Sequence, residues 1–455
     1  MNLDVITIPC PTEERPFLRT QKNSPTEHEG RASTLTDPIM GTEIPCTDRI
    51  PSPTTPTSVH KLRPGDIKVV AAVGDSLTAG NGVGAKGDNL FLVMSEYRGL
   101  SWSIGGDENI TTVTTLPNIL KEFNPNVTGF STGIGNQNTP GAFLNQAVAG
   151  AKSGGIPGQA RRLIDIMKND STVDFENDWK LVTLFIGGND LCQYCNDRAA
   201  LSPQNYSYHM MTSLDMLYKE VPRVIVNVME ILEIEGLRRI KRDSFGCNTL
   251  QKYVCPCFLL AGEDSSELAE VKRINRELQV ETERLVYGDR YDGREDFAVV
   301  VQPFFQNTVV PLNADSRPDD TYFSADCFHF SERGHSDMAA ALWNNMLEPV
   351  GKKQTYNNFT YGRKNIKCPS EEHPYIFTKE NSVPISTTAT APTTHSTTLP
   401  LTSNCTDNVP GWLAAVLAIT GILIGGGVTW LLLSCGAKRS KRVMTFAGEM
   451  TSTTF

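Results

Sequence analysis

Basic residues are few for a chain of this size. Its 42 Lys and Arg are outnumbered by 51 Asp and Glu, so the 455 residues carry a net charge of −9 at pH 7. Nucleic-acid binding needs a concentrated positive surface that attracts phosphates. The composition therefore excludes nucleic acid as an expected partner.

The N-terminus lacks the pattern of a secretory signal peptide. Residues 1–17 contain neither a basic start nor an apolar stretch of about 7 to 15 residues. This absence conflicts with several other features of the sequence, which indicate a protein that lies largely outside the cytosol.

Long apolar runs are absent apart from one, at residues 412–433. It holds 22 residues without a charge, enough to cross a hydrocarbon core of about 30 Å at about 1.5 Å per residue. Basic residues follow at 438–442, and such residues favour the cytosolic side. We expect a single-pass plasma membrane protein with a cytosolic C-terminus and a large extracellular part. Gly421 and Gly425 form a G-x-x-x-G pattern that would allow weak helix pairing.

Glycosylation signals and cysteines agree with an extracellular location. Of 11 cysteines, ten precede the apolar run. Cys192 and Cys195 with Cys255 and Cys257 have two interpretations, a zinc site or disulfides. We favour disulfides, because C-P-C is a poor chelating turn and the compartment is oxidising, but the sequence leaves their connectivity open. Six asparagines begin N-x-S/T glycosylation signals: Asn109, Asn126, Asn169, Asn205, Asn358 and Asn404.

Composition divides the chain into five parts. Residues 1–60 are rich in Pro, Ser and Thr and are expected to be a linker, and residues 61–370 a globular domain. Residues 371–410 have the composition of a Ser/Thr/Pro-rich stalk. A transmembrane helix is expected at 411–435 and a cytosolic tail at 436–455.

The globular part alternates apolar runs with helical patterns. Continuous apolar runs are typical of strands buried on both faces, and helices between them imply a parallel sheet. Residues 264–286 have apolar side chains at helical spacing, with polar residues to cap the start. We expect a three-layer α/β/α fold with about five parallel strands in a flavodoxin-like order. The expected strands are 67–73, 142–150, 180–188, 223–231 and 297–305.

Polar or glycine clusters follow four of these runs. Ser76 lies in a G-D-S sequence after the first, and Gly150 ends the second. Asn189 follows the third, and Asp326 and His329 lie past a loop after the fifth. Because ligands bind beyond the carboxyl ends of parallel strands, these residues are expected to converge.

The converging residues match the needs of acyl transfer. Ser76 would be the nucleophile, His329 its base, and Asp326 the carboxylate that orients the imidazole. The backbone N–H groups of Ser76 and Gly150 and the amide of Asn189 would stabilise the oxyanion. This chemistry requires no metal and no cofactor.

A second serine matches a hydrolase motif better than Ser76 does. Residues 129–133, GFSTG, fit the G-x-S-x-G nucleophile elbow around Ser131. That elbow needs a strand before it and a helix after it, but proline and glycine occupy the flanks. We therefore interpret Ser131 as a loop residue.

Three other polar residues have structural interpretations. His335 is the alternative base, but it is expected to pack in the last helix. Asp190 is expected to bond backbone N–H groups in its own turn. Arg98 has two interpretations, a lipid-phosphate contact or a surface salt bridge.

Taken in order, the G-D-S, glycine, G-x-N-D and D-x-x-H blocks resemble the SGNH (GDSL) hydrolases. Residues 74–86, 96–107 and 188–195 further resemble the animal membrane-associated phospholipase B group, a likeness that covers about residues 60–435. The resemblance implies Ser76, Asp326 and His329 as the triad and Gly150 with Asn189 in the oxyanion hole.

The resemblance also implies substrates. It predicts a calcium-independent enzyme that removes acyl chains from glycerophospholipids and lysophospholipids, with retinyl esters and acylglycerols as further substrates, and an apical, brush-border location. Two alternatives remain: a carbohydrate acetylesterase of the same fold, or an adhesion ectodomain on an inactive hydrolase scaffold.

A sequence repeat offers an explanation for the missing signal peptide. Residues 10–24 and 368–382 are identical at eight of 15 positions. The second copy ends the globular part, so the first is expected to end a preceding unit, and this chain to be the last repeat of a longer protein. Cys46 and Cys368 are candidates for a disulfide that joins the ends of the domain.

Overall fold

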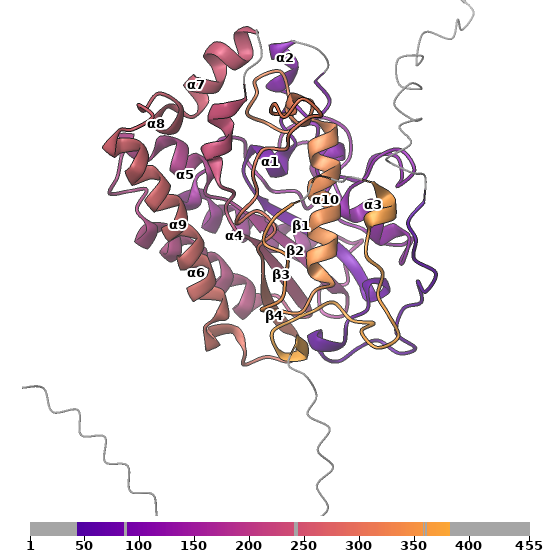
Figure 1. Ribbon diagram of the computed structural model, residues 1–455. Coiled ribbons are helices and arrows are strands. Elements are labelled where there is room, and N and C mark those ends of the chain that lie inside the picture. The colour runs from indigo at the N-terminus through magenta and orange to yellow at the C-terminus, as the bar shows by residue number, and fades with distance from the viewer. Residues whose placement is uncertain (1–42, 86–88, 241–243, 358, 360–361, 383–455) are drawn as a thin grey trace, which may run out of the picture. The chain divides into compact units, whose positions relative to one another are not determined.

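The computed structural model describes residues 43–85, 89–240, 244–357, 359 and 362–382 (Figure 1). Contacts divide the chain into two compact units, 1–385 and 386–455, and every described residue belongs to the first. The expected membrane helix at 411–435, with Gly421 and Gly425, lies outside the described residues. So do the glycosylation signals at Asn358 and Asn404 and the first copy of the repeat.

A parallel sheet forms the centre of the unit. Its strands are β1 (Ile67–Gly74), β2 (Trp179–Phe185), β3 (Val224–Met229) and β4 (Phe297–Gln302), hydrogen-bonded in that order. All positions of β2, β3 and β4 are buried. The apolar runs therefore form strands that are covered on both faces, as predicted.

Helices cover the sheet on two sides. Figure 1 shows α4 (Ile156–Asn169), α6 (Pro203–Glu220) and α9 (Ser266–Tyr287) on one side. On the other side are α3 (Leu116–Lys121) and α10 (Glu332–Met346). This is the predicted three-layer α/β/α architecture. The remaining helices are short: α1 (Ser76–Ala79), α2 (Leu90–Val93), α5 (Gly188–Gln193), α7 (Gln251–Val254) and α8 (Pro256–Leu259).

The helix predicted at 264–286 forms almost as expected. Ser265 is its N-cap, and its side chain accepts a hydrogen bond from the Leu268 N–H. Glu267 lies in the first turn, where a negative charge is favourable. Its buried positions include Leu268, Val271, Ile274 and Leu278.

The prediction of a fifth strand at 142–150 was wrong. This segment does lie along the free edge of β1, where the Leu144 carbonyl accepts from the Ala72 N–H at 3.0 Å and the Ala72 carbonyl accepts from the Gln146 N–H at 2.9 Å. Only one isolated bridge results, between Ala72 and Asn145. The chain cannot extend further because Phe143 has φ +45° and Gly150 has φ +75°, both outside the strand region.

The packed unit is longer than predicted at both ends. Ile44 and Cys46 are buried, although residues 1–60 were expected to be a linker. Residues 371–382 were expected to begin a stalk, but the Ile376 N–H donates to the Leu62 carbonyl at 2.8 Å and Ile376 is fully buried. A disulfide between Cys46 and Cys368 joins the two ends.

The four glycosylation-signal asparagines within the described residues, at 109, 126, 169 and 205, are all exposed. Among the helices of the described residues, none has the length and apolar character needed to span a bilayer.

Candidate active site

Ser76 lies at the sharp turn that connects β1 to α1. Asp75 precedes it as the N-cap, and its Oδ1 accepts from the Leu77 N–H at 2.9 Å. The turn requires glycine at position 74, because a Cβ there would lie 2.6 Å from the Phe185 carbonyl oxygen. Ser76 is thereby held at the start of a helix, at the carboxyl edge of the sheet.

Three side chains form a hydrogen-bonded chain at this edge. Ser76 Oγ lies 2.9 Å from His329 Nε2, and His329 Nδ1 lies 2.6 Å from Asp326 Oδ2. The other oxygen of Asp326 accepts from the backbone N–H groups of Phe328 and His329, at 3.1 and 3.0 Å. Asp326 is fully buried and therefore holds the imidazole with Nε2 directed at the serine.

The charges of the site favour a basic imidazole. Burial alone would lower the pKa of His329, but the Asp326 carboxylate outweighs burial, so the pKa is raised above its ordinary value. Burial likewise opposes the ionisation of Asp326, yet His329 and the two backbone N–H groups leave its pKa lowered. Asp75, also buried, has its pKa raised to about 7.

The raised pKa of His329 predicts how activity falls on the acid side of the pH profile. A general base must be neutral, and a raised pKa means that His329 takes up its proton at a higher pH than an ordinary histidine. We expect kcat/KM on a soluble ester to fall as the pH drops, with the midpoint above about 6.5. The measurement is a profile from about pH 5 to about pH 9, with His60→Gln as control. A midpoint below that of an ordinary histidine would contradict the assignment.

Asn189 and Gly150 are adjacent, but only Asn189 lines the pocket next to Ser76. Asn189 Nδ2 donates to the carbonyl of Ala151 at 2.9 Å, which ties α5 to the loop that contains Gly150. Gly150 has φ +75°, and a Cβ there would meet nothing within 4 Å. The backbone conformation at position 150 therefore favours glycine, although a larger side chain would meet no steric obstacle there.

Asp190 has a structural role, as expected, but its main partner lies outside its own turn. Its carboxylate accepts from the N–H and hydroxyl of Ser153, at 2.9 and 2.5 Å. This contact joins the G-x-N-D sequence, which contains Asn189, to the loop that follows Gly150. Burial raises the pKa of Asp190.

Arg98 fits neither of its two interpretations. It is 1% exposed and so can neither reach a lipid headgroup nor form a surface salt bridge. Its guanidinium donates to the carbonyls of Gly135, Asn145 and Ala147, at 2.6 to 2.8 Å, and pairs with Glu96. Arg98 therefore holds the segment that leads to Gly150.

Ser131 and His335 are structural within this unit. Ser131 is fully buried in a loop, and its Oγ donates to the Arg98 carbonyl at 2.8 Å. His335 packs in α10, and its Nδ1 accepts from the Trp102 N–H at 3.2 Å. Burial lowers the pKa of His335 to about 3, so it stays neutral.

Three disulfides connect the site to one segment, residues 244–261. Two run to the α5 region, Cys192–Cys255 and Cys195–Cys257. The third, Cys247–Cys327, reaches the residue that follows Asp326. The disulfide interpretation of the first four cysteines is confirmed, and it leaves no thiolate for zinc. Segment 244–261 is thus linked covalently both to the α5 region, which contains Asn189, and to the loop that contains Asp326 and His329.

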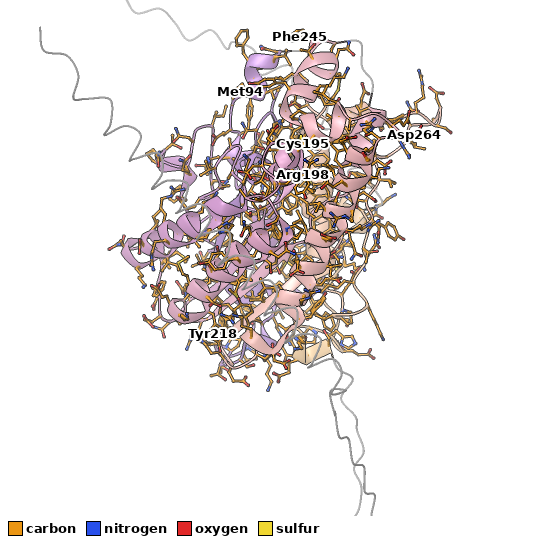
Figure 2. The ribbon with its side chains drawn as sticks, turned by 90° about the vertical axis from the view of Figure 1, so that its left-hand side faces the viewer. Met94, Cys195, Arg198, Tyr218, Phe245 and Asp264 are labelled. Atoms are coloured by element: carbon orange, nitrogen blue, oxygen red, sulfur yellow. A yellow bond between two sulfur atoms is a disulfide. The ribbon has the colours of Figure 1, made fainter. Side chains whose placement is uncertain are left out.

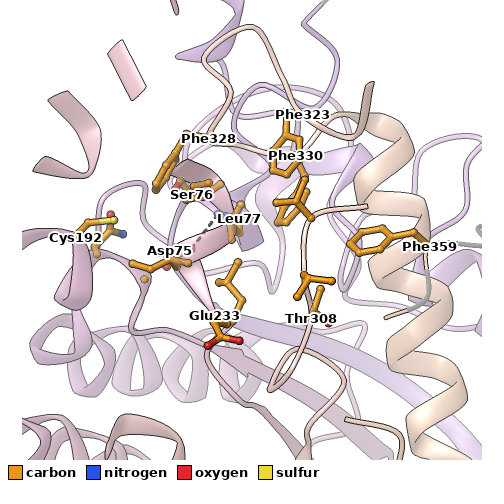
Figure 3. A pocket seen from close by; sticks show the side chains of 17 residues that line it. Asp75, Ser76, Leu77, Cys192, Glu233, Thr308, Phe323, Phe328, Phe330 and Phe359 are labelled. Carbon is orange, nitrogen blue, oxygen red and sulfur yellow. Dashed lines mark hydrogen bonds between the residues drawn. The ribbon is translucent and has the colours of Figure 1, made fainter. Parts of the chain in front are cut away.

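An apolar pocket of about 650 Å³, which includes its open mouth, lies against Ser76 (Figure 3). In this view Phe323, Phe328 and Phe330 lie at the same end of the pocket as Ser76, and Glu233 and Thr308 lie at the other. The sequence interpretation missed these side chains. Their signal was the alternation in residues 326–330, where Phe328 and Phe330 flank His329. The other apolar side chains of the lining are Leu77, Leu232, Ile234, Leu237, Val309, Val310 and Phe359.

A Ser–His–Asp chain at the carboxyl edge of a parallel α/β sheet is the arrangement of a serine hydrolase. The family model for GDSL-like lipase/acylhydrolase matches residues 70–342. The chain belongs to this family, and the resemblance noted in the sequence is confirmed.

Individual relatives give the same placement. Membrane-associated phospholipase B1 of Homo sapiens is 50% identical over 379 residues, which cover 82% of this chain and 26% of that protein. The protein of that name from Rattus norvegicus is 48% identical over 381 residues, covering 83% and 26%. The chain therefore spans about a quarter of the length of these relatives. A crystal structure of a GDSL-like lipase from Parabacteroides merdae aligns at 12% identity, covering 61% of this chain and 94% of that one, but its TM-score of 0.33 is too low to support an argument.

Proposed function

We propose that the chain is a serine carboxylic-ester hydrolase that removes acyl chains from glycerophospholipids and lysophospholipids. The observation that carries the proposal is the position of Ser76, which is bonded to His329 and opens onto the apolar pocket. An acyl chain in this pocket would place its ester carbonyl next to Ser76. The relatives that are named phospholipase B1 support this substrate class.

The proposed chemistry uses the chain's own residues. Ser76 Oγ attacks the ester carbonyl while His329 Nε2 takes its proton, and the imidazolium then protonates the leaving alcohol. Water repeats these steps on the acyl-enzyme, which releases the fatty acid. The N–H groups of Ser76 and Gly150 and the second Nδ2 hydrogen of Asn189 stabilise the oxyanion, so the mechanism assigns no role to a metal or cofactor.

The pocket favours long acyl chains over acetyl groups. Each buried methylene contributes about 0.8 kcal/mol, and an acetyl group would leave nearly all of this lining unused. The hydrogen-bonded triad in turn argues against an inactive adhesion ectodomain. The pocket also suits retinyl esters and acylglycerols, which we propose as further substrates.

The test compares substrates on residues 43–385, which have their own core and a disulfide between their ends. We expect hydrolysis of phosphatidylcholine and lysophosphatidylcholine at rates well above that of an acetylated sugar. Activity on the acetylated sugar alone would contradict the lipid assignment.

A variant that fills the pocket should separate long substrates from short ones. Val310 lines the pocket, and its Cγ2 lies close to Gly236, so Val310→Trp leaves less room for a chain. We expect kcat/KM for p-nitrophenyl palmitate to fall at least about tenfold and that for p-nitrophenyl acetate to change less than about threefold. Val280→Trp on α9 is the control, because Val280 is 49% exposed and does not line the pocket. Equal losses on both esters would show that the pocket does not bind the acyl chain.

We further propose the location of the enzyme: a single-pass plasma membrane protein with the hydrolase unit outside the cell, apical by resemblance. The exposed glycosylation signals and the four disulfides of the described residues support an extracellular unit. The charge-free run at 412–433 supports the tether.

A further inference from the structure

Three large apolar side chains are exposed together at one end of the unit. Phe91 is 88% exposed, Met94 74% and Phe245 67%. We call these three residues the crest. Figure 1 places α2 and α7 next to each other at this end, and Figure 2 shows Met94 and Phe245 there from a second direction. A Cβ on Gly246 would lie 2.8 Å from Leu90 Cδ2, so the two segments are in contact.

Each half of the crest is attached to the active site. The segment after α2 bonds to the end of α1, where the Gly82 N–H donates to the Ser95 carbonyl at 3.1 Å and the Asn81 N–H to the Ser76 carbonyl at 3.0 Å. Phe91 and Met94 are therefore connected to the helix that begins at Ser76.

The other half is attached to the histidine loop. Phe245 comes two residues before Cys247, whose disulfide partner is Cys327, and Gln251 Nε2 donates to the Cys327 carbonyl at 2.8 Å. The next residue, Phe328, lines the pocket. The crest is thus continuous with two walls of the proposed acyl site.

The two segments that carry the crest differ in charge from the whole chain. Residues 89–95 contain no charged side chain, and residues 244–261 contain one, Lys252. The chain as a whole carries −9. Two segments with one cation and no anion of their own do not repel phospholipid headgroups, and contiguous exposed apolar side chains are typical of an interaction surface.

We propose that the crest docks on the surface of aggregated lipid, a bilayer or a micelle, and orients the pocket toward it. Phe91, Met94 and Phe245 insert among the headgroups, and a phospholipid then moves from the surface to Ser76. This inference builds on the proposed function, but the docking step itself involves no catalysis.

The first test measures docking without hydrolysis. Residues 43–385 with Ser76→Ala are mixed with phosphatidylcholine vesicles, and the bound fraction is determined by flotation. We expect Phe91→Ser, Met94→Ser and Phe245→Ser together to lower the partition coefficient at least about tenfold. The matched control is Ile50→Ser with Val280→Ser, whose side chains are 70% and 49% exposed and lie outside the crest. Thermal unfolding checks that all variants fold.

The second test uses the active enzyme. With Ser76 intact, the triple variant should hydrolyse soluble p-nitrophenyl butyrate within about twofold of the parent and phosphatidylcholine vesicles at least about tenfold more slowly. Unchanged vesicle binding by the triple variant would overturn the proposal and leave the proposed function standing. If the protein binds vesicles through the crest but hydrolyses no lipid, the proposed function would be refuted and the docking surface would stand. Concentration-dependent dimers that the triple variant abolishes, without vesicle binding by the parent, would show that the crest pairs two copies of the chain and would overturn the proposal.

Discussion

Replacing Ser76 with alanine should lower kcat on phosphatidylcholine and on p-nitrophenyl butyrate by about 10³-fold or more. The hydroxyl lies 2.9 Å from His329 Nε2, and alanine leaves that base without a nucleophile to activate. Ser76 is only 6% exposed, and the loss of one oxygen creates little space, so the unfolding temperature should change little. The measurements are initial rates and thermal unfolding on the same preparation.

Ser131→Ala is the matched control for this result. Ser131 is a buried serine in a hydrolase-like motif, and its Oγ donates to the Arg98 carbonyl instead of contacting a base. We expect Ser131→Ala to retain most of its activity and to lose about 1 kcal/mol of stability with this hydrogen bond. A reversal of the two outcomes would refute the assignment of Ser76.

Replacing Asp326 with asparagine should lower kcat by roughly 10³- to 10⁴-fold while the fold is kept. Asn preserves the shape of the side chain and one oxygen for the N–H groups of Phe328 and His329. Its amide nitrogen would then face His329 Nδ1, which stabilises the wrong tautomer and leaves Nε2 protonated. Such an imidazole cannot accept the proton of Ser76.

Asp319→Asn provides a comparable change outside the site. Asp319 also accepts bonds in a turn, from the Thr321 N–H and hydroxyl at 3.1 and 2.6 Å, but it does not contact His329. We expect its kcat within about threefold of the parent. A similar loss in both variants would mean that Asp326 acts through the stability of its loop.

Most of the site residues could be named from the sequence because they follow apolar runs that form buried strands. The continuous apolar runs at 67–73, 180–188 and 297–305 form buried parallel strands, and the carboxyl ends of such strands meet. The structure places His329 within hydrogen-bond distance of both Ser76 and Asp326 along this edge.

The failures have two causes, local backbone conformation and partners that are distant in sequence. The run at 142–150 has strand composition, but positive φ at Phe143 and Gly150 limits it to one bridge. Arg98 looked like a surface residue, yet carbonyls 37 to 49 positions away in sequence surround its guanidinium. Local sequence carries little information about such contacts.

Local sequence does not determine disulfide connectivity either. Cys247 and Cys327 are 80 positions apart, and nothing in the spacing selects this pair over others. The pocket was missed for a related reason, because its walls come from loops after several strands and converge only in the fold.

The most direct test of the account is covalent labelling of the nucleophile. A fluorophosphonate reacts preferentially with a serine that a base activates, and mass spectrometry of the digested protein identifies the labelled peptide. The account predicts a single label on Ser76, reduced by prior incubation with lysophosphatidylcholine and absent in Ser76→Ala. A label on Ser131, or one that persists in Ser76→Ala, would contradict it.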